Sequence, residues 1–351
     1  MARRITQKDI ARELGVSRAT VSYVLAGQAR RHRVSPDTEK RVMDVAQRLH
    51  YVPNGIARSL RNQKTHTIGV ILAGFESDWM QRLYSGIDEA TEAAGYTPII
   101  MARMWDAERE RRDMDWLLER RVDGILVCIP IPENRGYYRK LIRQGFPIVF
   151  VGDNLPGLAK SCCVRWDSPA AVRKIVEHLV SIGRKRIAFC GVLHGTEMTI
   201  GRHDAYRAEL EARGLEQHEE WTFWAPTTHP DPMAMRNWLA DLFRDRGPCP
   251  DAIFALNDAI AFSVLRELRA LGVDVPGEAA VAGLGNVTLV DEEIHRVTTV
   301  QEPVREYGSH GVVALLDLIE GRREGPLLDV ISSERLIVRN STVPDAELAA
   351  R

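Results

Sequence analysis

Long hydrophobic runs are missing from this chain of 351 residues, because no apolar stretch approaches the ~18 residues that a membrane-spanning helix needs. The basic N-terminal residues are not followed by an apolar segment, so they do not form a secretory signal. The five cysteines, at 128, 162, 163, 190 and 249, show no C-x-x-C spacing, which argues against a disulfide framework and a structural zinc site. We therefore expect a cytoplasmic protein with no metal site and no membrane partner.

Signatures of common catalytic and nucleotide sites are absent as well. The chain has no G-x-x-x-x-G-K, no G-x-S-x-G and no H-E-x-x-H, and Gly283-x-Gly285 lacks the third glycine of a dinucleotide fingerprint. The sequence therefore predicts no catalytic residues, no cofactor and no enzyme.

Charge is distributed unevenly along the chain. The net charge is only −1, but residues 1–62 carry +8 and the remainder carries −9. A basic head on an acidic body indicates an anionic partner for the head, although charge alone fits a merely soluble basic domain equally well.

Three short helical patterns fill residues 1–53. Thr6 and Ser17 are predicted to cap the first two helices, which are separated by Gly15-Val16-Ser17, and Ser35 with Pro36 opens the third. Two helices joined by a tight glycine turn are typical of a helix-turn-helix domain.

The second of these helices has two distinct faces. Val21, Val24 and Leu25 share the side expected to pack inward, whereas Arg18, Ala19, Ser22 and Tyr23 share the other. Side chains at the start of a recognition helix meet base edges in the major groove, and Arg can contact guanine O6 and N7 together. The alternative is that Arg18 and Tyr23 are ordinary solvated side chains.

From residue 67 onward, short apolar runs alternate with amphipathic helices. The runs cover 68–73, 98–101, 124–129, 148–152, 186–191, 221–225, 252–256 and 280–284, and the expected helices include 79–94, 107–121, 169–183, 203–213 and 258–271. This alternation predicts an α/β body with parallel, doubly wound sheets, and eight such units favour two lobes. Ligands bind beyond the carboxyl ends of such strands, where Asp153, Arg202 and Asn257 lie.

Several segments together resemble the LacI-type (LacI/GalR) family of transcription regulators. They are residues 9–25 (DIARELGVSRATVSYVL), 34–36 (VSP) and 51–60 (YVPNGIARSL) in the head, and in the body 67–70, 122–125, 183–188, 255–258, 271–276, 298–300 and 339–342. The resemblance implies a hinge helix and linker at 54–66 and a two-lobed body at 67–341 similar to periplasmic sugar-binding proteins. It places lobe 1 at about 67–167 and 301–326, lobe 2 at about 168–297 and 327–341, and a tail at 342–351.

The resemblance and the helical pattern together assign two sets of site residues. Predicted DNA contacts are Thr6, Ser17, Arg18, Ala19, Thr20, Ser22, Tyr23, Arg33, Ser35, Asn54, Ala57, Arg58 and Leu60. Predicted effector contacts are Trp79, Met80, Asp153, Arg202, Trp224 and Asn257. In the family, the leucine at the position of Leu60 wedges into the minor groove, although it could instead anchor the linker. Trp79 could also be plain lobe packing, and Asp258 is expected to cap a helix rather than bind ligand.

Three departures from the family pattern stand out. Ala26 replaces the usual Asn, and residues 28–33 carry about three extra residues, mostly basic, which either add phosphate contacts or, the favoured interpretation, form a tolerated surface insertion. The segment Gly283-Leu284-Gly285-Asn286 stands where sugar-binding relatives show two aspartates after an aromatic residue, which weakens the expectation of a sugar.

The resemblance implies a sequence-specific DNA-binding regulator, most simply a repressor. We expect a homodimer on a near-palindromic double-stranded operator, with a sugar or related metabolite bound between the lobes as effector. An activator or corepressor-dependent regulator of the same fold is the alternative, followed by a ligand-binding protein or an enzyme. Effector identity, target genes and any tetramer stay open.

Overall fold

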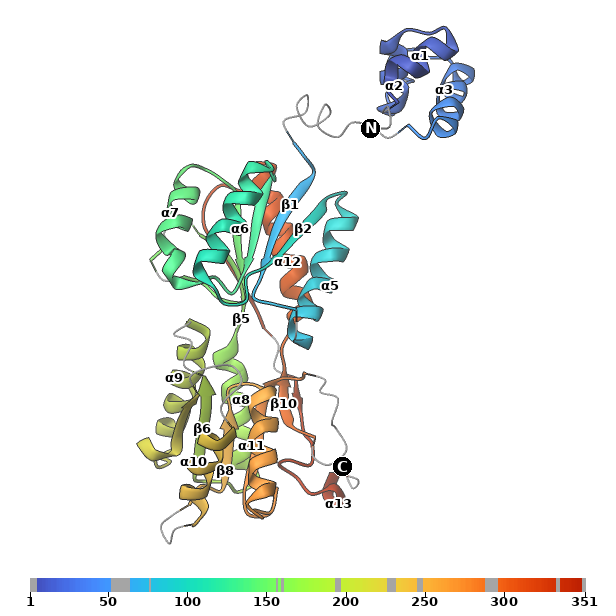
Figure 1. Ribbon diagram of the computed structural model, residues 1–351. Helices are drawn as coiled ribbons and strands as arrows, with labels where there is room; N and C mark the ends of the chain where they lie inside the picture. Colours follow the sequence, from blue (N-terminus) through green and yellow to red (C-terminus); the bar gives the residue numbers. More distant parts are fainter. Residues whose placement is uncertain are drawn as a thin grey trace. The chain divides into compact units, whose positions relative to one another are not determined.

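The computed structural model of the chain describes ten stretches (Figure 1), namely residues 5–51, 64–75, 77–155, 157–158, 161–192, 197–225, 232–244, 249–287, 296–332 and 335–348. Internal contacts divide the chain between Thr65 and His66 into two compact units. We call the first unit the head and the second the body, and each is described by itself.

The head is a bundle of three helices, α1 (Gln7–Leu14), α2 (Arg18–Leu25) and α3 (Pro36–Arg48). Its core is built from small and β-branched side chains of all three helices and of the segment between α2 and α3, namely Ile10, Ala11, Val21, Val24, Ala29, Val42, Val45 and Ala46. Gly15 ends α1 in the left-handed conformation at φ 66°, which allows the sharp turn into α2. The predicted helix-turn-helix is thus present.

The first sheet of the body has the strand order β11-β5-β4-β3-β1-β2, and all its neighbouring strands are parallel. Its strands are β1 (Thr67–Leu72), β2 (Thr97–Ala102), β3 (Gly124–Cys128), β4 (Ile148–Val151), β5 (Cys162–Trp166) and β11 (Leu327–Ile331). The helices α5 (Asp78–Ala93), α6 (Ala107–Glu119), α7 (Arg135–Arg143) and α12 (Val304–Ile319) accompany it, with a 3-10 turn at Pro132–Asn134. We call this layered unit lobe 1.

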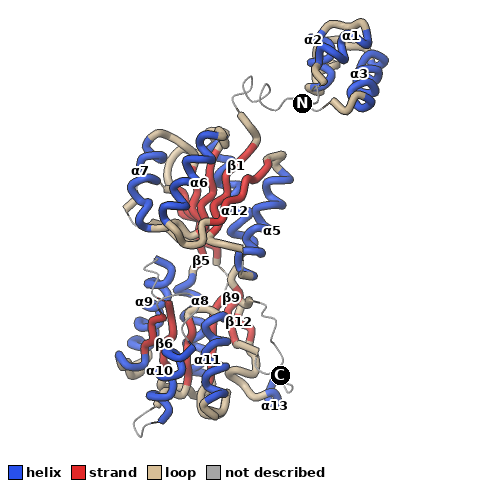
Figure 2. The backbone as a smooth tube through the Cα atoms, viewed as in Figure 1, coloured by secondary structure: helices blue, strands red, loops and turns tan. Residues whose placement is uncertain are grey.

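The second sheet has the order β12-β10-β9-β8-β6-β7. Its strands are β6 (Ile187–Val192), β7 (Thr222–Ala225), β8 (Ala252–Ala255), β9 (Ala280–Gly285), β10 (Thr298–Gln301) and β12 (Leu336–Ile337), of which β12 is antiparallel to β10. The helices are α8 (Ser168–Ser181), α9 (Glu197–Ala212), α10 (Pro232–Arg244), α11 (Asp258–Ala270) and α13 (Asp345–Leu348), with a 3-10 turn at Glu219–Trp221. Figure 2 shows the two sheets as separate groups of strands, each flanked by helices. This second unit is lobe 2.

The chain passes between the lobes three times within the body. It leaves lobe 1 after β5, returns after β10 into α12, and leaves again after β11. Two of these passages, at residues 167 and 302–303, therefore lie close to the strand ends where the ligand site was expected.

Helices α5 and α12 approach each other unusually closely on lobe 1. A Cβ at Gly86 would lie 2.0 Å from the Arg305 carbonyl oxygen, and one at Gly308 would lie 2.4 Å from the Leu83 carbonyl oxygen. Only glycine fits at these two positions. The close packing holds α12, which enters lobe 1 from lobe 2, against α5.

The expected fold class is confirmed, but one lobe boundary is wrong. Residues 327–341 were assigned to lobe 2, whereas β11 pairs with β5 in lobe 1 over the register Leu327↔Cys162 to Ile331↔Trp166. The burial of β11 alternates and Arg165 interrupts the apolar residues of β5, so neither strand is a continuous apolar run. The predicted hinge helix lies outside the described residues.

Candidate DNA-reading face and ligand cavity

Capping hydrogen bonds define where each helix of the head begins. The Ser17 hydroxyl accepts a bond from the Thr20 backbone N–H at 3.0 Å, and the Ser35 hydroxyl accepts one from the Thr38 N–H at 3.2 Å. At the start of α1 the Thr6 hydroxyl donates to the Asp9 carboxylate at 2.7 Å. Three of the proposed DNA contacts, Thr6, Ser17 and Ser35, thus also orient the helix ends that they occupy.

The two faces of α2 separate as the pattern predicted. Val21 and Val24 are buried at 0% and 4% exposure, whereas Arg18 and Ala19 are exposed and Ser22 and Tyr23 are partly exposed. We call Arg18, Ala19, Ser22 and Tyr23 the reading face. It presents one cation, one methyl group and two hydroxyls, which are groups that can recognise base edges.

Two of the remaining predicted DNA contacts, Thr20 and Arg33, lie in the described part of the head. Arg33 is exposed and has a positive φ of 55°. Thr20 is partly buried, and its hydroxyl lies 2.8 Å from that of Ser17. Four further predictions, at the hinge, lie outside the described residues: Asn54, Ala57, Arg58 and Leu60.

A cavity of about 110 Å³ lies where the lobes meet. Side chains from the ends of β4, β5 and β11, from α9 and from two interlobe passages line it, namely Gly152, Asp153, Arg165, Trp166, Asp167, Ser168, Pro169, Met198, Gly201, Arg202, Glu302 and Val330. Pockets for drug-sized ligands usually measure about 300–1,000 Å³. A ligand the size of a sugar would therefore require the lobes to adjust around it.

Arg202 lies at the centre of the polar wall of this cavity. It is 3% exposed, its Nη1 donates to the Leu256 carbonyl oxygen at 3.1 Å, and its Nη2 lies 3.4 Å from the Glu302 carboxylate. Its guanidinium also lies over the Trp166 ring, 5.4 Å from the centroid. The Arg202 Nε is buried without a hydrogen-bond partner among the described residues, so one donor remains for a ligand.

Asp153 contributes the opposite charge from lobe 1. It is 3% exposed, and one carboxylate oxygen accepts the Asn154 N–H at 2.8 Å while the other accepts the Met198 N–H at 3.3 Å. Because Asp153 follows β4 and Met198 begins α9, this contact joins the two lobes across the cavity. The structure thus brings Asp153 and Arg202, two of the six predicted effector contacts, to one cavity.

The other four predicted effector contacts do not line the cavity. Met80 is 6% exposed and belongs to the core of lobe 1. Trp79 packs beside Tyr307, with ring centroids 6.2 Å apart, and close to Gly152. Trp224 packs against Phe189 in an aromatic cluster of lobe 2, with centroids 5.2 Å apart. Their apolar surface is used for packing, which is the alternative already considered for Trp79.

Asn257 occupies a structural position as well. Its side-chain oxygen accepts the Ile260 N–H at 3.0 Å, so Asn257 is the cap of α11. The expectation that Asp258 caps this helix is wrong by one residue. The Asp258 side chain is instead buried within lobe 2, where it is 1% exposed and accepts the Val287 N–H at 2.9 Å.

Burial of Asp258 changes its acidity. Desolvation raises the pKa of this carboxyl to about 6, against partial compensation by hydrogen bonds and by Arg339. Gly283 makes room for the group, because a Cβ there would lie 2.5 Å from one carboxylate oxygen. The departure from the family pattern around Gly283 thus coincides with a tightly packed acid.

Several cavity residues were missed by sequence reasoning, above all Trp166, Asp167 and Glu302. A signal existed for Asp167, whose carboxylate accepts the Ala170 N–H at 3.2 Å and which precedes a Ser-Pro pair in the manner of a helix start. Glu302 lies two residues after the 298–300 segment that resembles the family. Both were overlooked because β5 and β10 were not predicted as strands, so their carboxyl ends were not searched.

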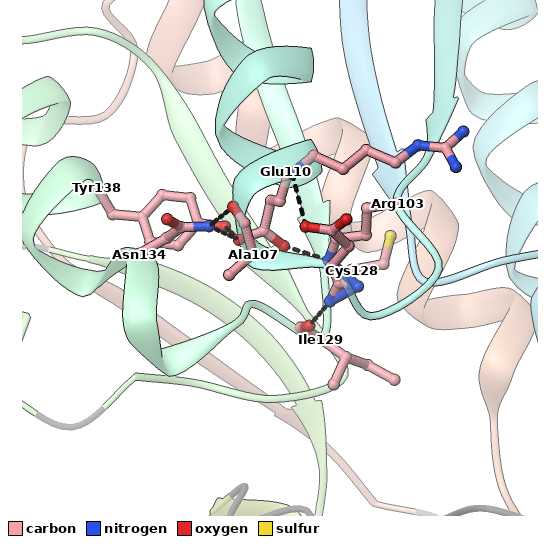
Figure 3. A network of polar contacts seen from close by, with 9 residues as sticks. Arg103, Ala107, Glu110, Cys128, Ile129, Asn134 and Tyr138 are labelled. Atoms are coloured by element: carbon pink, nitrogen blue, oxygen red, sulfur yellow. Dashed lines mark hydrogen bonds and ion pairs between the residues drawn. The ribbon is translucent and has the colours of Figure 1, made fainter.

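A second buried polar network lies in lobe 1 but does not line the cavity (Figure 3). Arg103 and Glu110 form an ion pair with both side chains at 0% exposure, and Arg103 also donates to the carbonyl oxygens of Cys128 and Ile129. The Tyr138 hydroxyl and the Asn134 amide donate to the same Glu110 oxygen. The network ties the ends of β2 and β3 to α6 and α7, so it fixes one edge of lobe 1.

The described residues offer neither a cluster of metal ligands nor a membrane-spanning helix. No group of three His, Cys, Asp or Glu side chains there could hold a metal ion. No helix in the same stretches is long and apolar enough to cross a bilayer.

A helix-turn-helix with an exposed polar reading face, carried on a chain with a two-lobed ligand-binding body, defines the class of DNA-binding transcriptional regulators. Comparisons with known proteins agree. The model for bacterial regulatory proteins of the lacI family matches residues 6–54, and that for a periplasmic binding protein-like domain matches residues 176–342. The chain belongs to the lacI family of bacterial regulatory proteins.

Individual relatives extend over nearly the whole chain. Catabolite control protein A of Staphylococcus xylosus is 29% identical over 313 residues, which cover 88% of this chain and 90% of that protein. The structure of a complex of the transcriptional regulator CelR with cellobiose is 27% identical, with a TM-score of 0.71 over 96% of this chain and all of that one. The lac repressor dimer bound to operator is 22% identical, with a TM-score of 0.83 over 97% of this chain and 99% of that one, and shows the shared fold.

Proposed function

We propose that the protein is a repressor that binds a near-palindromic operator as a homodimer and is released by a small neutral effector. The observation that carries this proposal is the convergence of Asp153 and Arg202, from different lobes, on one cavity of a chain that also holds a DNA-reading helix. Two heads on successive major grooves would account for the dimer and for the symmetry of the operator.

The charges around the cavity favour a hydroxyl-rich neutral ligand such as a sugar. Arg202 already faces Glu302, so an anionic ligand would have to compete with a buried carboxylate for the same guanidinium. A hydroxyl group can accept from the Arg202 Nε and donate to Asp153 without moving a net charge into the protein. The cellobiose bound to CelR is consistent with this ligand class.

The coupling to DNA is proposed to run through the relative position of the lobes. The Asp153 contact with Met198 and the Arg202 contact with Glu302 hold the present arrangement around the small cavity. A ligand that binds a different arrangement more tightly would shift the population toward it, and the same difference in free energy would alter operator affinity.

The effector site can be tested with a charge-neutral pair of substitutions. In Arg202→Gln with Glu302→Gln, no unpaired buried charge remains, so we expect the body to stay folded and the chain to keep binding operator. Neutral sugars, sugar acids and nucleosides are screened for ligands that raise the melting temperature of the wild-type chain. The apparent affinity derived from these shifts should be at least tenfold weaker in the double variant. Arg207→Gln, on the exposed side of the same helix, is the matched control. An unchanged response in the double variant would exclude this cavity as the effector site.

The DNA reader can be tested by footprinting and substitution. The wild-type chain should protect an inverted repeat, and Arg18→Ala should weaken that binding by about 1–3 kcal/mol and relax preference at one base pair. An equal loss on random DNA would contradict base recognition by Arg18. The direction of the ligand effect separates release, which fits a repressor with an inducer, from tightening, which fits the corepressor-dependent alternative. Conversion of the bound ligand by the purified protein would instead revive the enzyme alternative.

A further inference from the structure

The segment between α2 and α3, residues 28–33, is a closed and anchored turn. The Gln28 N–H donates to the Tyr23 carbonyl oxygen at 2.8 Å, and the Val34 N–H donates to the Ala29 carbonyl oxygen at 2.9 Å. Within the turn, His32 N–H donates to the Gln28 carbonyl oxygen at 3.2 Å. Ala29 is 1% exposed and belongs to the head core. A surface insertion without a role needs no such anchor in the core.

The turn also contacts the reading face directly. The His32 imidazole stacks on the Tyr23 ring, with centroids 3.6 Å apart and planes inclined by only 5°. Tyr23 is the last residue of the reading face, so the stack fixes the turn at the C-terminal end of that face. It also covers one side of the Tyr23 ring and restricts the directions in which the ring can lie.

The turn carries a concentrated positive charge. Arg30, Arg31 and Arg33 are all exposed. Among the described residues of the head, the ion pairs are those of Arg41 with Asp37, at 4.0 Å, and of Arg48 with Glu13, so the charges of the turn are not neutralised there. Exposed arginines beside a recognition helix are suited to phosphate oxygens, which they contact irrespective of base sequence.

We propose that this turn is a second DNA-contact element of the head. Arg30 and Arg31 bind backbone phosphates of the duplex next to the bases read by α2, and His32 is a positioning residue that orients Tyr23 on the reading face. The inference rests on the DNA-binding function proposed above, and it assigns the inserted residues a role that the resemblance to the family did not supply.

The phosphate contacts are tested by the salt dependence of binding. Full-length wild type, Arg30→Ala with Arg31→Ala, and a control with Arg139→Ala and Lys140→Ala on the exposed side of α7 are titrated with operator and with random duplex over a salt series. The slope of log K against log salt is negative, and each lost phosphate contact reduces its magnitude by about 0.9. In the double arginine variant, the magnitude of the slope should therefore fall by about 2 for each bound head. Its affinity should fall by a similar factor for operator and for random DNA. The control should match wild type.

The role of His32 is tested by the ratio of operator to random affinity. His32→Ala should lower this ratio at least threefold with the salt slope unchanged, whereas His32→Phe, which keeps a flat ring against Tyr23, should retain the wild-type ratio. Melting curves of each variant check that the head is folded. If His32→Ala unfolds the head, the ratio measured for His32→Phe decides, and a loss there overturns the positioning role.

The outcomes separate this inference from the proposed function. A wild-type chain that binds no operator would refute the proposed function itself. A wild-type chain that binds operator, with a double arginine variant of unchanged salt slope, would refute the phosphate contacts alone. A His32→Ala variant with the wild-type ratio would refute the coupling to Tyr23 and leave the turn as a structural link between helices.

Discussion

Two buried charged side chains, Asp258 and Arg202, illustrate how single residues in the body combine packing with polar function. Asp258 is nearly inaccessible and accepts the Val287 N–H, and interactions with Thr299 and Asn286 also oppose the rise in its pKa. Arg202 is almost as buried, lines the cavity, and has one donor, Nε, without a hydrogen-bond partner among the described residues. From the buried Asp258 we expect a pH-dependent stability of lobe 2, and from the pair of Arg202 with Glu302 we expect the cavity to discriminate ligands by charge.

The raised pKa of Asp258 predicts a pH-dependent stability. The folded state binds this proton more tightly than the unfolded state, so the contribution of Asp258 to stability improves as the pH falls from about 6 toward 4. Between pH 7 and pH 5, wild type should gain about 1–1.5 kcal/mol relative to Asp258→Asn in urea denaturation. Asp241→Asn, at an exposed site on α10, should follow the wild-type profile. Parallel profiles for wild type and Asp258→Asn would refute the prediction.

Substitution of Glu302 is expected to change the relative affinity of the cavity for anionic and neutral ligands. Glu302→Gln keeps an acceptor for the Tyr307 hydroxyl, which lies 3.1 Å from the carboxylate, but removes the negative charge facing Arg202. The ratio of glucuronate to glucose affinity, measured by calorimetry, should rise at least tenfold, about 1.4 kcal/mol. Glu211→Gln, an exposed position on α9, serves as control. A ratio that stays at the wild-type value would show that Glu302 does not set the charge of the cavity.

Residue-level prediction from sequence succeeded where local chemistry decides. The caps of α2 and α3 at Ser17 and Ser35 follow from side-chain bonding to the next turn, which depends on a few neighbouring residues only. Predictions failed for residues whose surroundings are formed by segments that are distant in the sequence. Met80 is a core residue because α5 lies against the sheet, and Glu302 reaches the cavity because the chain crosses between lobes there.

Among the described strands, the eight apolar runs of the sequence correspond to β1 to β4 and β6 to β9, whereas β5, β10, β11 and β12 were not predicted. Strands β1, β3 and β9 consist of continuous buried runs, so their apolar sequence is sufficient to reveal them. Strand β11 alternates between partly and fully exposed positions, and it becomes a strand because β5 provides a partner. Pairing of that kind is a tertiary effect and leaves little trace in the local sequence.

The crossing of α5 and α12 predicts a strong effect of one added methyl group. Gly308→Ala places a Cβ within 2.4 Å of the Leu83 carbonyl oxygen and 2.7 Å of the Ile87 nitrogen, so the helices must separate. We expect a loss of about 3 kcal/mol or more in unfolding free energy, measured by thermal and chemical denaturation. Gly136→Ala on α7 meets no described atom within 4 Å, and should leave stability unchanged or raise it by up to about 1 kcal/mol. Equal stability of the two variants would contradict the close approach.

At the scale of the whole chain, a DNA-reading head and a two-lobed body follow from sequence because each has its own pattern, three capped helices in one and strand–helix alternation in the other. The presence of two lobes in the body was predicted as well, but the lobe to which residues 327–331 belong was not, because the lobes exchange segments. Residues from three separate stretches complete lobe 1, and only pairing across the sheet reveals which stretches belong together.

The shared C-terminal segment predicts that a truncation damages both lobes at once. A chain that ends at Pro326 lacks β11 from the first sheet and β12 from the second, together with the Ser341 hydroxyl that donates to the Val281 carbonyl oxygen at 2.6 Å. We expect no cooperative unfolding transition by calorimetry, whereas a chain that ends at Leu348 should melt like wild type. A cooperative transition retained by the shorter chain would show that one lobe is independent of this segment.

The three passages between the lobes have a consequence for synthesis of the protein. A ribosome releases β1 to β5 early, but α12 and β11, which complete the same lobe, emerge only after all but one strand of lobe 2. The nascent polypeptide therefore carries an unpaired edge at β5 while residues 167–326 are translated. Chaperone dependence during expression, and sensitivity to the speed at which the last segment is translated, follow from the order of the strands.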